Sequence, residues 1–287
     1  MGRYLDGVRA KFGGDTRGLL DGGRHALLHT RTMEFDELRP YVPGDDVRDI
    51  DWKASARSGS VLIKRFVSEK HHKVLLVVDA GRDMTARTPG GERKGDVAGQ
   101  IMGAIGLITL GRSDEIGMVY GDSRGSVNVR SGRGETHVEQ LLHRYRYHDD
   151  DRGPSDIACQ LDYVATHYRH PMVLVVISDE PDVDDRLTDV LGRVAARHDV
   201  LWAMVGDRPA IEVGGEGGHD VGTGRAVLAS VAGDPKVVAA YRHAEQRRRA
   251  RLAELMAGHA VPYVTISATA ELRPRIVDMT GSFSRAR

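Results

Sequence analysis

The sequence lacks the residues on which several protein classes depend. It has a single cysteine, Cys159, in 287 residues, which excludes an internal disulfide framework and any metal site built from several cysteines. Neither sign of charge is in excess, because 41 Lys and Arg residues balance 41 Asp and Glu residues. No overall electrostatic field therefore draws the chain to nucleic acid, and we predict no nucleic-acid partner.

Long apolar runs are also missing. No stretch approaches the roughly 18 apolar residues that a transmembrane helix needs, and residues 1–10 contain no apolar segment typical of a signal peptide. We therefore expect a protein without a membrane span, and its single cysteine favours the cytoplasm. Hydrophobic residues at 40% and charged residues at 29% are typical of a folded globular protein.

Two enzyme signatures are absent or out of place. No Gly-x-x-x-x-Gly-Lys-Ser/Thr loop occurs, so the chain should not itself be a P-loop ATPase. Residues 121–125 read Gly-Asp-Ser-Arg-Gly, the pattern of a hydrolase nucleophile elbow, but a strand follows where that elbow requires a helix. We predict a hairpin loop there instead.

From residue 73 onward, short runs rich in Val and Ile alternate with segments of helical period, which predicts a doubly wound α/β fold with a mostly parallel sheet. The predicted strands are 74–79, 116–120, 127–129, 173–178, 201–205 and 263–266. The predicted helices are 95–110, 138–144, 156–168, 185–197, 235–256 and 271–277. No helix separates the second strand from the third, so these two should form one antiparallel hairpin.

Residues 1–72 lack this alternation. We therefore predict two parts, an N-terminal appendage of residues 1–72 and the α/β domain of residues 73–287. Within the appendage we expect a helix near residues 17–29 and an extended stretch at residues 60–68.

Acidic residues follow two strands that should be central, because both are apolar throughout. Asp79 ends the first strand, Asp83 lies four residues later, and Asp179 ends the fourth strand. Ligands of open α/β sheets bind beyond the carboxyl ends of the strands, so these loops should meet, with Ser155 at the head of an intervening helix as a further contributor. Oxygen ligands from separate loops suit Mg²⁺, although an Asp at a strand end often only caps a turn.

This pattern resembles the von Willebrand factor A fold. Its metal-ion-dependent adhesion site combines Asp-x-Ser-x-Ser after the first strand, a Thr before a later helix and an Asp after the fourth strand. Asp79, Ser155 and Asp179 fit three positions, whereas Gly81 and Asp83 stand where the two serines belong. The resemblance implies a degenerate site that binds Mg²⁺, Mn²⁺ or Ca²⁺ weakly through Asp83 and the three fitting residues.

Clustered carboxylates raise one another's pKa, so a positive charge should lie beside them. A divalent ion can supply it, and so can a cationic side chain such as Arg82. A third possibility is a metal-free scaffold that has kept the fold and lost the site. The sequence leaves these alternatives open.

The appendage carries a more specific pattern. Glu34-Phe35 leads through LRPY at residues 38–41 and PGDD at residues 43–46 to RDIDWKASAR at residues 48–57. This motif resembles the domain of unknown function 58 (DUF58) family, in which it directly precedes a von Willebrand A domain. The resemblance covers nearly the whole chain, and it implies a MoxR-type AAA+ ATPase partner and a client complex that the sequence does not identify.

Physical chemistry explains part of this motif. Pro43-Gly44 suits the central positions of a type II turn. Asp51 can cap a short helix that Gly59 ends, and Trp52 supplies a large apolar anchor that we expect to be buried.

The charged residues of the motif allow two interpretations. Asp45 and Asp46 can pair with Arg48 and Arg57 to lock the motif closed. Alternatively, the two arginines can face outward and bind a partner.

We therefore predict a non-enzymatic adaptor that works with a MoxR-type AAA+ ATPase in the assembly or activation of a client complex. The alternative is a metal-dependent hydrolase with Asp79, Asp83 and Asp179 as ligands. Such an enzyme needs a general acid or base beside the metal, and only Glu180 or Asp182 is available for that role.

Overall fold

The chain forms two compact units, residues 1–27 with 72–287, and residues 28–71. The computed structural model describes residues 3–12, 34–42, 45–67, 73–111, 114–148, 151–209, 211, 220–222, 224–226 and 234–285. Each unit is described by itself below.

The larger unit is built on a six-stranded sheet with the order β5-β4-β3-β6-β7-β8. Its strands are β3 (Lys73–Asp79), β4 (Glu115–Asp122), β5 (Gly125–Gly132), β6 (Val173–Asp179), β7 (Asp199–Val205) and β8 (Tyr263–Ile266). Only β5 runs antiparallel to its neighbour, and the other pairs are parallel. All six predicted strands and the hairpin at residues 121–125 are confirmed, and the strand order is that of the predicted von Willebrand A type.

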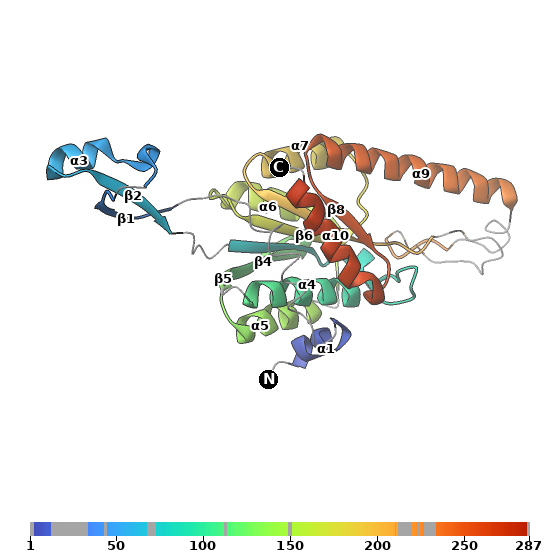
Figure 1. Cartoon of the computed structure of the whole chain (residues 1–287). Helices are drawn as coiled ribbons and strands as arrows, with labels where there is room; N and C mark the ends of the chain where they lie inside the picture. Colours follow the sequence, from blue (N-terminus) through green and yellow to red (C-terminus); the bar gives the residue numbers. More distant parts are fainter. Residues whose placement is uncertain are drawn as a thin grey trace. The chain divides into compact units, whose positions relative to one another are not determined.

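Helices cover both faces of this sheet (Figure 1). One face packs against α4 (Lys94–Leu110), α5 (Glu135–Arg146) and α10 (Leu272–Arg285), and α1 (Arg3–Phe12) lies on α4 and α5. The other face packs against α6 (Ile157–His167), α7 (Asp185–Ala195) and α9 (Pro235–Gly258). Two short 3-10 helices, η2 (Arg82–Thr85) and η3 (Thr269–Glu271), lie between these elements.

The central strands divide their side chains between the two core layers. In β3, Leu76 and Val78 join the layer of α4 and α5, whereas Leu75 and Val77 join the layer of α6 and α7. Each such burial contributes roughly 1.5–3 kcal/mol. The strand is therefore held on both sides, which fixes the position of Asp79 at its carboxyl end.

Helix α1 belongs to the sheet unit, although its residues fall within the predicted appendage of residues 1–72. It buries Leu5 and Val8 against α4 and α5, and Val8 lies so close to Gly103 that a Cβ there would come within 2.5 Å of Val8 Cγ2. The Glu139 carboxylate accepts hydrogen bonds from the backbone N–H groups of Tyr4 and Leu5, at 3.0 and 2.6 Å. The partners of α1 are far away in sequence, so local pattern could not reveal them. The helix predicted near residues 17–29 lies outside the described residues.

The smaller unit pairs β1 (Glu34–Pro40) with β2 (Leu62–Val67) in an antiparallel sheet, and this confirms the extended stretch predicted at residues 60–68. Between the strands lie η1 (Val47–Asp49) and α3 (Trp52–Ser58). As predicted, Asp51 caps α3 by accepting from the N–H of Ala54 at 2.9 Å, and Gly59 ends it with φ of 72°. The predicted turn at Pro43-Gly44 lies outside the described residues.

The prediction that Trp52 is a buried anchor is wrong. Its side chain is 69% exposed, and the only residue that α3 buries is Ala54. A unit this small buries only a limited share of its surface, so the helix rests on a small residue and leaves the indole in solvent.

Candidate functional site

Three of the predicted acidic residues converge at the carboxyl edge of the large sheet. β3 and β6 are hydrogen-bonded neighbours, so Asp79 and Asp179 end adjacent strands, and Asp83 lies in η2 just after β3. The charges of Asp179 and Asp83 both act on Asp79. The strand-end rule therefore located the cluster correctly.

Asp79 is the most deeply buried member, at 1% exposure. Its Oδ1 accepts a hydrogen bond from the Gly81 N–H at 2.7 Å, whereas Oδ2 has no partner among the residues that the structure describes. Burial and the nearby charge of Asp179 raise the pKa of Asp79 to about 7. Burial also raises the pKa of Asp179 to about 6, although the charge of Lys94 opposes this rise.

Gly81 approaches the Ser155 backbone too closely to carry a side chain. A Cβ at residue 81 would lie 2.5 Å from Ser155 Cα and 2.6 Å from its Oγ. The departure from the Asp-x-Ser-x-Ser pattern thus has a steric cause, because a serine here would displace the loop. Ser155 Oγ is itself buried and makes no hydrogen bond of regular geometry in the described part of the chain, although its closeness to Asp79 opposes the rise in the pKa of that carboxyl group.

Asp156, rather than Ser155, is the N-cap of α6. The Asp156 side chain accepts from the N–H of Cys159 at 3.1 Å. A carboxylate satisfies this orphan donor as well as a hydroxyl does. The Ser155 hydroxyl therefore stays beside Gly81.

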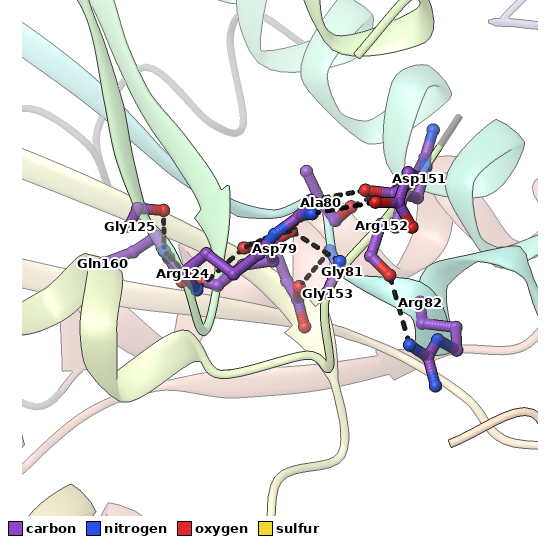
Figure 2. A network of polar contacts seen from close by, with 11 residues as sticks. Asp79, Ala80, Gly81, Arg82, Arg124, Gly125, Asp151, Arg152, Gly153 and Gln160 are labelled. Carbon is purple, nitrogen blue, oxygen red and sulfur yellow. Dashed lines mark hydrogen bonds and ion pairs between the residues drawn. The ribbon is translucent and has the colours of Figure 1, made fainter. Parts of the chain in front are cut away.

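A hydrogen-bond network holds the loop before Ser155 in place (Figure 2). Asp122, at the end of β4, accepts from the Gly153 N–H at 2.7 Å and from Arg124 Nη2 at 2.8 Å. The Gly153 carbonyl accepts from the Arg82 N–H at 2.8 Å. Burial opposes ionisation of Asp122, but these donors outweigh it and lower its pKa to about 2. The loop is thus tied to β4 on one side and to η2 on the other.

A lysine, rather than Arg82, is the cation of the cluster. Lys94 is the first residue of α4 and is 1% exposed. Its Nζ lies 3.6 Å from Asp179 Oδ2 and also pairs with Asp207, which follows β7. The side chain of Arg82 is exposed instead. Lys94 therefore joins carboxylates from two different strand ends.

Sequence reasoning missed Lys94, Asp207 and Asp122. Asp207 and Asp122 could have been found by the rule that found Asp79, because both lie at carboxyl ends of predicted strands. Lys94 carried a weaker signal. A cation in the first turn of a helix opposes the helix dipole, which indicates that carboxylates compensate for it.

The residues of the cluster fit a divalent ion poorly. Gly81 offers no side-chain oxygen, and the Lys94 ammonium already pairs with two of the acids. In favour of an ion, Asp79 Oδ2 and Ser155 Oγ lack partners in the described part of the chain. Within that same part, no group of three or more His, Cys, Asp or Glu side chains is arranged to hold a metal. Metal binding by Asp79, Asp83, Ser155 and Asp179 stays a prediction.

Glu180, considered above as a general acid or base, is committed to α9. Its Oε2 pairs with Arg248 Nη2 at 2.7 Å and with Arg249 Nε at 3.2 Å. The neighbouring pocket of about 330 Å³ is lined by Asp182, Val183, Ala244, Arg247, Arg248 and Arg251. These ion pairs attach the carboxyl-terminal half of α9 to the loop after β6.

The smaller unit exposes apolar side chains in a short stretch of chain. Large apolar residues that are exposed there are Leu38, Val42, Val47, Trp52 and Val61. Arg57, in the last turn of α3, is exposed as well. The side chain of Arg48 lies outside the described residues.

One acid of the predicted charge lock, Asp45, pairs with a residue outside that lock. Asp45 pairs with Arg39 at 2.6 Å and accepts from the Val42 N–H at 2.9 Å. These two contacts lower the pKa of Asp45. The carboxylate thus closes a loop at the end of β1 and leaves Arg57 facing solvent.

Comparison with protein families identifies one match. The profile of the family described as "Protein of unknown function DUF58" matches residues 37–251. A curated protein of Mycobacterium tuberculosis, described as uncharacterized, is 26% identical over 275 residues, which cover 93% of this chain and 85% of that protein. A Mycobacterium bovis protein matches to the same extent.

Solved structures with a similar fold include two bacterial proteins. An aerotolerance-related membrane protein from Bacteroides fragilis has a TM-score of 0.46 at 11% identity, covering 73% of this chain and 98% of that chain. A von Willebrand factor type A protein from Catenulispora acidiphila has a TM-score of 0.44 at 12% identity, covering 77% and 43%. Among the described helices of the present chain, none has the length and apolarity to span a membrane.

Proposed function

The chain belongs to the DUF58 family, whose profile matches residues 37–251, and on this premise we propose that it is a non-enzymatic interaction protein that binds its partner through the smaller unit. The observation that carries the proposal is the exposure of Trp52. A tryptophan that is mostly exposed contributes little to the stability of its own unit, whereas tryptophan is among the residues that contribute most to binding between proteins.

Other exposed residues of the same unit support the same function. Val47, Val42 and Val61 are exposed within the same unit, and Arg57 adds an exposed cation on the same helix as Trp52. Aromatic residues and arginine are enriched in protein interfaces, whereas isolated exposed apolar residues are ordinary. We call Val42, Val47, Trp52 and Val61 the apolar surface of the smaller unit.

The partner that we propose is a MoxR-type AAA+ ATPase, with a client complex that the pair assembles or activates in the cytoplasm. This partner rests on the resemblance of the motif at residues 34–57 to the DUF58 family, and the apolar surface lies within that motif or next to it. The larger unit would then hold the client, at the carboxyl edge of the sheet where von Willebrand A domains bind.

The hydrolase alternative is less well supported. Hydrolysis needs a general acid or base beside the metal, and the carboxylate of Glu180 is held by Arg248 and Arg249. Asp182 is exposed in the loop beyond it. The geometry therefore favours binding over catalysis.

The test measures binding of the purified chain to a MoxR-type ATPase from the same host by biolayer interferometry. Trp52→Ala should weaken binding at least tenfold, because truncating an interface tryptophan commonly costs about 2 kcal/mol or more. Its melting temperature should stay within about 1 °C of the wild type, since the side chain is 69% exposed. Arg57→Glu should also weaken binding without lowering the melting temperature.

Tyr147→Ala is the matched control, because Tyr147 is an aromatic residue of the larger unit with 67% exposure. It should bind as the wild type does. Failure of the wild-type chain to bind the ATPase would reject the proposed partner, and equal affinity of Trp52→Ala and the wild type would reject the proposed surface.

A further inference from the structure

The position of Lys94 in the acidic cluster is unusual for a lysine. The side chain is 1% exposed, and burying an ammonium group costs several kcal/mol unless it is paired. Its place in the first turn of α4 adds an unfavourable interaction with the helix dipole. Both disadvantages must be offset by its carboxylate partners.

One of those partners, Asp179, comes from a loop that the metal-ion-dependent adhesion site would use, and the other, Asp207, comes from the loop after the next strand. Asp179 ends β6 and lies 3.6 Å from Nζ, and Asp207 follows β7 and pairs with the same nitrogen. The Lys94 charge also acts on Asp83. One ammonium group thus interacts with carboxylates from three separate loops, which is the task of a divalent ion in an open site.

We propose that Lys94 is the resident cation of this site, so that the carboxyl edge of the sheet is held together without a divalent metal. Gly81 fits this arrangement, because the Ser155 backbone fills the space in which a serine ligand would stand. The proposal concerns the larger unit and is independent of the partner proposed for the smaller one.

Lys94 and a divalent ion would differ in what they offer to a partner protein. A divalent ion in an adhesion site keeps an open position that can accept an acidic side chain of a partner. The Lys94 ammonium is buried and already paired with carboxylates of its own chain, so it offers no such position. Acidic partners should therefore gain nothing from added Mg²⁺.

The experiment compares melting temperatures of the full chain in EDTA and in 5 mM Mg²⁺, Mn²⁺ or Ca²⁺. The wild type should melt at the same temperature in all four buffers. Lys94→Met, which keeps the length of the side chain and removes its charge, should melt roughly 10 °C lower in EDTA, because buried carboxylates lose their partner. At least one ion should restore a few degrees to this variant by binding to the folded state.

Lys94→Arg and Arg93→Met are the controls. Lys94→Arg retains the positive charge, so it should keep most of the stability of the wild type, and added metal should not change its melting temperature. The second removes an exposed cation from the adjacent residue and should behave as the wild type. If Lys94→Met gives no folded protein, the double variant Lys94→Met with Asp207→Asn removes one acid along with the cation and serves for the same comparison.

Three results would overturn the proposal. A rise in wild-type melting temperature with metal, abolished by Asp79→Ala, would show that the site binds an ion beside Lys94. A Lys94→Met variant as stable as the wild type in EDTA would show that no cation is needed. A variant that loses stability and recovers none with any ion would limit Lys94 to a packing role.

Discussion

Replacing Asp79 by asparagine should stabilise the protein, and the gain should depend on pH. The carboxyl group is buried, with one oxygen lacking a partner in the described part of the chain, and its pKa is raised from 3.8 to about 7. A carboxyl group whose pKa is raised by folding favours the native state most below pH 4. This contribution is lost as the pH rises from about 4 to about 7, because the unfolded chain then releases the proton while the buried carboxyl group still holds it.

The size of the effect follows from the shift. Each pKa unit corresponds to about 1.4 kcal/mol, so ionised Asp79 destabilises the native state by up to about 4 kcal/mol at pH 8. Asparagine is neutral at every pH and keeps an oxygen that can accept from the Gly81 N–H. Asp79→Asn should therefore be more stable than the wild type at pH 8 by a few kcal/mol, with little difference near pH 4.

Urea unfolding in EDTA between pH 4 and pH 8.5 measures this difference. Asp182→Asn, which removes an exposed acid from the same edge of the sheet, is the control and should show no such dependence. A gap between Asp79→Asn and the wild type that stays constant with pH would refute the reasoning. So would a variant less stable than the wild type at pH 8.

Two further predictions concern the loop before Ser155. Gly81→Ser should destabilise the fold by roughly 2–3 kcal/mol in urea unfolding, because the added Cβ would lie 2.5 Å from Ser155 Cα, and Gly99→Ser, with no such atom near its Cβ position, should cost less. The pKa of Asp122 is lowered to about 2, so the stability that its charge contributes is lost as the pH falls from 4 to 2. Asp122→Asn should therefore lose less stability than the wild type over this pH range. Solvent screening at half-exposed Arg124 limits the Asp122 effect to under about 2 kcal/mol, and an unchanged pH profile would contradict it.

The large sheet was predictable because its signals are local. Apolar runs such as residues 74–78 occur only where both faces of a strand are covered, and Asp79 and Asp179 stand at the ends of such runs. The direction of parallel strands then places both acids at one edge. The strands of the large sheet and the acidic cluster at its edge could therefore be predicted from the sequence alone.

The features that escaped prediction depend on contacts between distant segments. Lys94 is 85 residues from Asp179 and 113 residues from Asp207 in the sequence, so no local sequence pattern connects the lysine with these two acids. The exposure of Trp52 depends on how little the smaller unit can cover, whereas residue type alone favours burial. Ser155 and Asp156 are both residue types that commonly cap helices, and residue type alone does not show that Asp156 takes this role.

The close approach of Gly81 to Ser155 also constrains the order in which this site could change under mutation. A side chain at residue 81 and the present path of residues 153–155 exclude each other, so an oxygen ligand cannot be introduced by one substitution alone. The loop would first have to be released from Asp122, and that step is unfavourable on its own. Lys94, by contrast, can change in one step. In a library of variants selected for binding new partners at this edge, we therefore expect substitutions that change its charge to appear before substitutions that change the path of the loop.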